Sequence, residues 1–151
     1  IEGKVAVIAG NEGGTQADAR RDGAKEAFEK AGMEVVAVEQ CDFDAQKAYD
    51  AASAIIDANP DLVGITCGND DMALGVYDYY KQHNLKLPLI LGINNSPEMN
   101  QKIQAGEIYG TVDNGTNDQI TYICKLLNDI LNKDTAKYHK IWYSKPFAIE
   151  K

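Results

Sequence analysis

Five polar or aromatic residues follow the predicted strands of this chain, in the loops or helix starts that come next. They are Arg20, Phe43, Asn69, Asn94 and Asn114. Side-chain amides both donate and accept hydrogen bonds, a guanidinium donates them, and an aromatic ring offers an apolar face. Such groups at one edge of a sheet suit the recognition of a small polar ligand rich in hydroxyl groups.

Asn69 has the clearest setting of the five. The apolar run 62–67 predicts a strand buried on both faces, Gly68 ends it, and a helical pattern begins near Asp71. Ligands of open α/β sheets bind outside the carboxyl ends of the strands, and Asn69 is expected at that edge. The simpler interpretation is also open, because Asn69, Asp70 or Asp71 could each cap the helix.

Residues for other chemistries are sparse. The histidines, His83 and His139, fall at a helix end and in the tail, which argues against a histidine base or metal site. The glycines of 10–14 match neither the dinucleotide fingerprint nor a P-loop. Asp70 and Asp71 could hold Mg²⁺, although adjacent carboxylates more often stabilise a helix start. We therefore predict no catalytic residue, no metal and no cofactor.

Composition sets further bounds. The 151 residues are 44% hydrophobic and 25% charged, which fits one globular domain. A net charge of −8 disfavours nucleic acid as a partner.

Cys41, Cys67 and Cys124 have no metal-site spacing and are predicted to be free, mostly structural thiols. The chain opens at Ile1 without a signal peptide, so we expect a mature product or an excised piece.

Strand-like and helix-like segments alternate along the chain. We expect strands at 4–9, 34–38, 62–67, 88–93 and 108–112, helices at about 16–31, 45–58, 70–83, 96–106 and 117–131, and an edge strand within the tail 139–149. The first helix should carry one apolar face of Ala24, Ala27, Phe28 and Ala31, and the second an apolar stripe of Ala48, Ala51, Ala52, Ile55 and Ile56. This alternation predicts an α/β fold: a doubly wound, mostly parallel sheet of five or six strands with helices on both faces.

Four segments together resemble the periplasmic sugar-binding proteins of the ribose and glucose/galactose type. Residues 68–75 are similar to the N-D-x-M-A-x-G segment of that family, and residues 91–98 to its G-x-D-x-x-P-E segment. Residues 106–119 resemble the G-T-V-x-N-x-x-N-x-Q segment, and 19–20 the arginine that opens the first helix of the C-terminal lobe. The match covers essentially the whole chain in order and spacing.

The resemblance implies a non-enzymatic solute-binding protein of an ABC-type sugar transporter, with two similar lobes that close on a monosaccharide or polyol. It implies a bacterial periplasmic or extracellular location, secreted or lipid-anchored, and a membrane permease or chemoreceptor as partner. It also implies that residues 1–151 are only the C-terminal lobe. The helix at 117–133 is then expected to cross the hinge toward an absent N-terminal lobe, and here to be displaced, swapped between chains or buried in a homodimer.

The resemblance also implies roles for individual residues. Asn69 matches a sugar-binding amide, and Arg20 a sugar-binding arginine, although a shift of two positions would put Asp18 there. Phe43 matches an aromatic residue that stacks on the sugar ring, and Asn114 an amide at the hinge crossing. Each also has a structural interpretation: an ion pair on a helix for the arginine, loop packing for the phenylalanine, and a cap or turn for the asparagines.

Asn94 stands where the family usually carries Asp. A carboxylate accepts from two hydroxyls, whereas an amide offers one acceptor oxygen and two donors. The ligand is therefore open: another sugar, a polyol or a less sugar-like molecule. Two alternative functions also stay open, namely the effector or sensor domain of a sugar-responsive transcription regulator or sensor kinase, and an enzyme acting on a sugar or phosphosugar.

Overall fold

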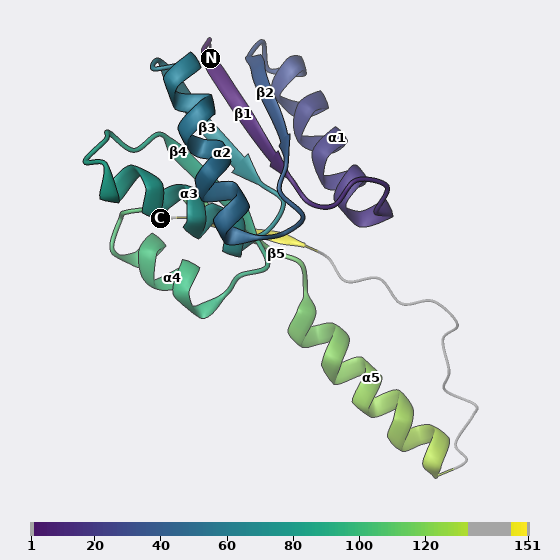
Figure 1. The fold of residues 1–151 in the computed structure, drawn as a ribbon. Coiled ribbons are helices and arrows are strands. Elements are labelled where there is room, and N and C mark those ends of the chain that lie inside the picture. The colour runs from purple at the N-terminus through teal and green to yellow at the C-terminus, as the bar shows by residue number, and fades with distance from the viewer. Residues whose placement is uncertain (1, 133–145, 151) are drawn as a thin grey trace.

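A six-stranded sheet forms the centre of the molecule in the computed structural model, which describes residues 2–132 and 146–150 (Figure 1). The strands are β1 (Lys4–Ala9), β2 (Glu34–Gln40), β3 (Leu62–Cys67), β4 (Leu89–Ile93), β5 (Gly110–Asp113) and β6 (Phe147–Glu150). Their order is β2-β1-β3-β4-β5-β6, with β1 to β5 parallel and β6 antiparallel to β5. The predicted α/β, doubly wound fold is confirmed.

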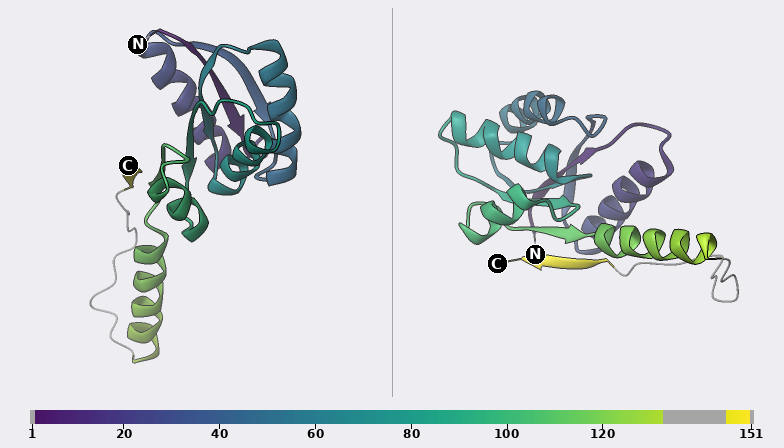
Figure 2. Two further views of the ribbon diagram at one scale, coloured as in Figure 1. Left: turned by 90° about the vertical axis from the view of Figure 1, so that its left-hand side faces the viewer. Right: turned by 90° about the horizontal axis from the view of Figure 1, so that it is seen from below.

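Helices lie on both faces of this sheet. They are α1 (Thr15–Lys30), α2 (Ala45–Ala58), α3 (Asp70–Gln82), α4 (Pro97–Gln104) and α5 (Thr116–Leu131). Helix α1 covers one face over β1 and β2, and α2 and α3 cover the other (Figure 2). Helices α2 and α3 approach closely because Gly75 has no Cβ, which would lie 2.1 Å from the backbone oxygen of Ala45.

The main core lies between the sheet and the pair α2 and α3. Ala48, Ala52 and Ile55 form the buried stripe of α2 that the sequence predicts, and Ile65 and Ile90 face it from the sheet. This packing fixes the strands in register, with Cys67 beside Ile8, Leu91 beside Thr66 and Val112 beside Ile93. The carboxyl ends of β1, β3, β4 and β5 therefore meet at one edge.

Three details differ from the sequence expectation. Strand β5 begins at Gly110, and Ile108 is a core residue outside the strand. Ala27 and Ala31 are exposed, because α1 turns Ala17 rather than these alanines into the protein. In the tail, β6 supplies an edge strand over 147–150, while 139–145 lie outside the described residues.

Helix α5 projects away from the sheet and its covering helices (Figures 1 and 2). None of its residues is buried. Its apolar stripe of Ile120, Ile123 and Leu127 is 54% exposed at each position. Among the described residues, no helix combines the length and apolarity required to cross a membrane.

Candidate functional site

One open pocket at the carboxyl edge of the sheet brings together all five residues singled out in the sequence. It has a volume of about 410 Å³. Its lining consists of Gln16, Arg20, Phe43, Asn69, Asn94, Asn114 and Thr116. The lining comes from the starts of α1 and α5 and from the loops after β2, β3, β4 and β5.

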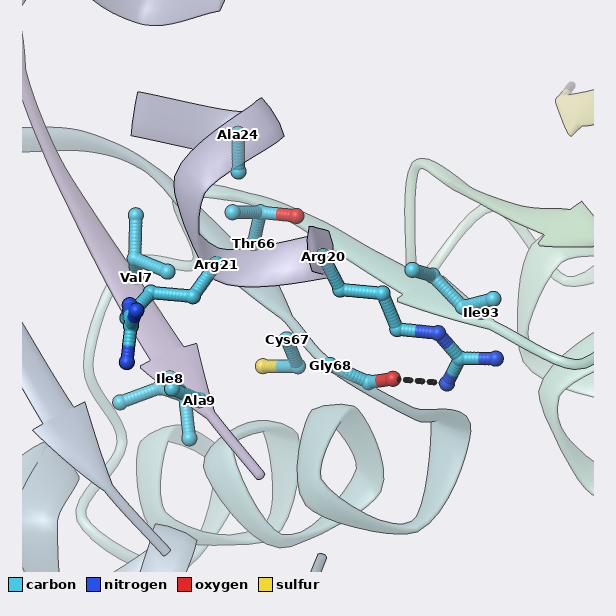
Figure 3. Close-up of a pocket in the computed structure, with 10 residues that line it drawn as sticks. All are labelled: Val7, Ile8, Ala9, Arg20, Arg21, Ala24, Thr66, Cys67, Gly68 and Ile93. Carbon is cyan, nitrogen blue, oxygen red and sulfur yellow. Dashed lines mark hydrogen bonds between the residues drawn. The ribbon is translucent and has the colours of Figure 1, made fainter. Parts of the chain in front are cut away.

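Arg20 reaches the pocket from the first turns of α1. Its guanidinium donates a hydrogen bond of 2.5 Å to the backbone oxygen of Gly68, at the end of β3 (Figure 3). Ion pairs with aspartates are made instead by Arg21, whose partners are Asp18 at 2.9 Å and Asp22 at 2.7 Å. The structure therefore brings Arg20 to the pocket, and Asp18 is not part of the lining.

Burial shapes the electrostatics of Arg20. Partial desolvation lowers the pKa of its guanidinium, and the negative charge of Asp70 opposes that shift. A guanidinium in a protein nevertheless stays protonated at neutral pH. Arg20 is thus a fixed positive charge at the pocket wall.

A smaller cavity of about 200 Å³ lies beside this pocket, between α1 and the sheet (Figure 3). Arg20 lines both, and much of the remaining lining is apolar, including Val7, Ala24 and Ile93. Apolar walls give a sugar few hydrogen-bond partners, so the larger polar pocket is the candidate site.

Phe43 supplies the apolar surface of the polar pocket. It lies in the loop after β2 with a left-handed backbone (φ 59°). A Cβ at Gly10 would lie 2.2 Å from its ring, so the ring rests directly on the backbone at the end of β1. The absence of a side chain at Gly10 gives the ring its position at the pocket.

Asn69 caps α3 and also lies at the pocket. Its side-chain oxygen caps α3 by accepting a 3.0 Å hydrogen bond from the backbone N–H of Met72. Its side chain also lines the pocket, although the residue is only 6% exposed. The amide nitrogen has two long contacts of 3.4 Å, to the backbone oxygen of Phe43 and to Asp71.

Asn94 and Asn114 form a pair that joins the loops after β4 and β5. The Asn114 amide nitrogen donates to the side-chain oxygen of Asn94 at 2.9 Å. The side-chain oxygen of Asn114 accepts from the backbone N–H of Thr116 at 3.2 Å and from the Thr116 hydroxyl. The pair is therefore oriented by the first turn of α5.

Asp70, the first residue of α3, is 1% exposed. It accepts hydrogen bonds from the backbone N–H of Ser96 at 2.7 Å and the hydroxyl of Thr111 at 2.6 Å. Gly92 makes room for it, because a Cβ there would lie 2.3 Å from the carboxylate. Asp70 thus ties α3 to β5 and to the loop that carries Asn94, and the described residues contain no cluster of His, Cys, Asp or Glu able to hold a metal.

Three residues of this site were missed by reasoning from sequence. Gln16 lies one helical turn before Arg20, and Thr116 follows Asn114 by two positions, so their spacing was an available signal. The supporting role of Asp70 had no such signal, because its partners lie 26 and 41 positions away.

Comparison with known proteins identifies the family. Residues 2–135 match the model of the periplasmic binding protein domain. The chain belongs to this family. The D-allose-binding periplasmic protein of Escherichia coli is 38% identical over 112 residues, which are 73% of this chain and 36% of that protein. The D-galactose/methyl-galactoside binding periplasmic protein MglB of Haemophilus influenzae is 34% identical over 66% of this chain and 30% of its own length.

Solved structures of the family show the same fold. An ABC transporter periplasmic solute binding protein from Actinobacillus succinogenes with bound D-allose has a TM-score of 0.90 and 24% identity, over 99% of this chain and 53% of that one. A solute binding protein from Bacillus halodurans with bound myo-inositol has a TM-score of 0.87 and 20% identity. The chain therefore spans about half of these structures and about a third of the curated relatives. These relatives are binding proteins and lend no support to a regulator, a kinase or an enzyme.

Proposed function

We propose that this chain is one lobe of a periplasmic solute-binding protein of an ABC transporter and that its polar pocket holds one side of a monosaccharide or polyol. The observation that carries the proposal is the meeting of Arg20, Phe43, Asn69, Asn94 and Asn114 around one pocket at the carboxyl edge of the sheet. The sugar-binding relatives support the ligand class.

The proposed recognition divides between apolar and polar contacts. The ring of Phe43 covers the C–H face of the ligand, and Arg20, Asn69 and Asn94 hydrogen-bond to its oxygen atoms. A ligand that leaves one of these groups buried and unpaired loses about 1–3 kcal/mol, which is the source of selectivity.

A second lobe would supply the remaining contacts. The pocket is open to solvent on one side, and related structures are about twice as long as this chain. We propose that residues 1–151 are the C-terminal lobe, that closure on the ligand creates the shape a permease or chemoreceptor reads, and that the protein acts in the periplasm. Alone, this lobe is expected to bind weakly, with Kd on the order of 1 mM.

Helix α5 is proposed to complete its packing on another unit. In a longer chain that unit is the N-terminal lobe, and for this chain alone it is a second copy. The support is the half-exposed stripe of Ile120, Ile123 and Leu127 on a helix without buried residues. Sedimentation of the chain and of Ile123→Glu tests this: we expect a dimer that the substitution dissociates, and a monomer with α5 docked on its own sheet would contradict it.

A thermal-shift screen against D-allose, D-ribose, D-galactose and myo-inositol tests the binding proposal, because a ligand of the native state raises its melting temperature. Asn69→Asp is the informative variant, since Asp still caps α3 but no longer donates into the pocket. The control is Asn128→Asp, which makes the same change in charge at an exposed position of α5. We expect a shift that Asn69→Asp abolishes and Asn128→Asp retains, and no shift with any of these compounds or with a sugar acid would contradict the proposal.

A further inference from the structure

The hydrogen bonds around the pocket fix which end of each amide is used within the protein. The backbone N–H of Thr116 can only donate, so the atom of Asn114 that receives it is the oxygen. The nitrogen of Asn114 then donates to Asn94, and the atom of Asn94 that receives it is also the oxygen. Both amide orientations follow from one backbone N–H.

The same reasoning applies to Asn69. The backbone N–H of Met72 donates to one lone pair of its oxygen, and its nitrogen makes two long contacts of 3.4 Å. The nitrogen of Asn94 makes no hydrogen bond within the part of the chain that the structure describes. At Asn94 both hydrogens of the nitrogen are therefore left for a ligand, while the oxygen keeps one lone pair. At Asn69 the nitrogen is held only by long contacts.

Arg20 adds further donors and a positive charge. One of its terminal nitrogens binds the backbone oxygen of Gly68, and a guanidinium has five N–H groups in all. No carboxylate lines the pocket among the described residues. Three carboxylates lie near the lining without belonging to it. Asp70 accepts from Ser96 and Thr111, and Asp113 accepts from the amides of Asn95 and Gly115. Asp71 contacts the amide nitrogen of Asn69 at 3.4 Å.

Among the described residues, this pocket offers several donors, a guanidinium that makes no ion pair, and no carboxylate acceptor. Neutral sugar hydroxyls donate as well as accept, and a carboxylate on the protein is the strong partner for their donation. A ligand carboxylate only accepts, and it pairs with a guanidinium and an amide nitrogen in charge-assisted hydrogen bonds.

We propose that this pocket selects a sugar acid, a uronate or aldonate, whose carboxylate lies between Arg20 and the amide nitrogen of Asn94. The inference rests on the proposed function, since it names the ligand class of the same site. The sugar-ring contacts with Phe43 and Asn69 are unchanged by it. What changes is the charge of the preferred ligand.

Matched ligand pairs test the charge preference. The ¹⁵N-labelled 151-residue chain is titrated by NMR with D-galactose against D-galacturonate and with D-glucose against D-glucuronate and D-gluconate, each to high millimolar concentration. Acetate serves as the control for a carboxylate without a sugar. We expect the acid of each pair to bind at least about tenfold more tightly than the neutral sugar at low salt, with the ratio falling when NaCl is raised from 25 to 250 mM.

The variant Asn94→Asp tests the position of the carboxylate. It replaces the donor with an acceptor and a negative charge, so the preference should reverse toward the neutral sugar. Asn128→Asp carries the same change in charge on exposed α5 and should keep the acid preference. The dispersion of the amide spectrum confirms that each variant is folded.

The outcomes separate the two proposals. Equal or tighter binding of the neutral sugars overturns the sugar-acid inference and leaves the proposed sugar-binding function standing. Binding of neither class overturns both. Acid binding that acetate reproduces, or that Asn94→Asp leaves unchanged, overturns the assigned position of the carboxylate.

Discussion

The side-chain oxygen of Asn94 accepts a 2.9 Å hydrogen bond from the side chain of Asn114, twenty positions later in the chain. The bond joins the loops after β4 and β5, which are neighbours in the sheet. It decides which atoms of Asn94 remain for a ligand. Two loops that the sequence separates thus act as one wall of the pocket.

Removal of this hydrogen bond should lower the affinity for the sugar ligand more than it lowers the free energy of unfolding. In Asn114→Ala, Asn94 loses the partner that orients it, and Thr116 loses its side-chain acceptor. We expect ligand affinity to fall about fivefold to thirtyfold, equivalent to a hydrogen-bond loss of about 1–2 kcal/mol. NMR titration measures the affinity, and Asn128→Ala on α5 is the control. Unchanged affinity would exclude the orienting role of Asn114.

A methyl group at Gly10 should displace the ring of Phe43. The Cβ of Gly10→Ala would lie 2.2 Å from that ring, so we expect a loss of about 1–3 kcal/mol in the free energy of unfolding together with weaker ligand binding. Gly23→Ala is the matched control, because it lies within α1 with nothing inside 4 Å of the new Cβ. That substitution should stabilise the protein by about 0.5–1 kcal/mol. Urea denaturation measures the free energy of unfolding of both variants. Equal changes in Gly10→Ala and Gly23→Ala would contradict the contact between Gly10 and the ring of Phe43.

The hydroxyl of Thr111 should be important for stability. Thr111→Val keeps the shape of the side chain but removes the 2.6 Å hydrogen bond to the buried carboxylate of Asp70. We expect a loss of about 1–3 kcal/mol in the free energy of unfolding, because a buried charged acceptor is left with one partner fewer. Thr121→Val on exposed α5 should stay within about 0.5 kcal/mol. A loss of similar size at both positions would contradict the role of Asp70.

Alkaline pH should destabilise the fold through its buried acids. Burial raises the pKa of Cys41 to about 11 and that of Tyr80 to about 12. Burial also raises the pKa of Cys67. The unfolded chain releases these protons earlier, near pH 8.5 for cysteine and pH 10 for tyrosine, so the native state holds more protons. The stabilisation is complete below about pH 8.5 and is lost progressively as the pH rises toward 11 and beyond.

Urea titrations at pH 7, 8.5 and 10 in the presence of reductant measure this dependence. Cys41→Ala removes one contributor and should flatten the decline. A free energy of unfolding that rises between pH 8.5 and 10 would show that other groups control the response.

Much of this fold follows from local patterns. The stripe of α2 and the apolar run of β3 define their elements, and the parallel order then brings Asn69 and Asn94 to one edge. Alanine residues did not predict which face of α1 is buried. Ala27 fits a packed or an exposed face equally well, and it is exposed. The partners of Asp70 depend on strand register and side-chain orientation, which no local pattern encodes.

The most direct test of the proposed site is a chemical-shift map of the ¹⁵N-labelled chain during titration with neutral and acidic monosaccharides. We predict shifts at the side-chain amides of Asn69 and Asn94 and at the backbone of Gly10, with Leu89 and Tyr109 at the opposite edge of the sheet unaffected. Shifts confined to Leu89 and Tyr109, or none with any sugar, would contradict a saccharide site at the carboxyl edge.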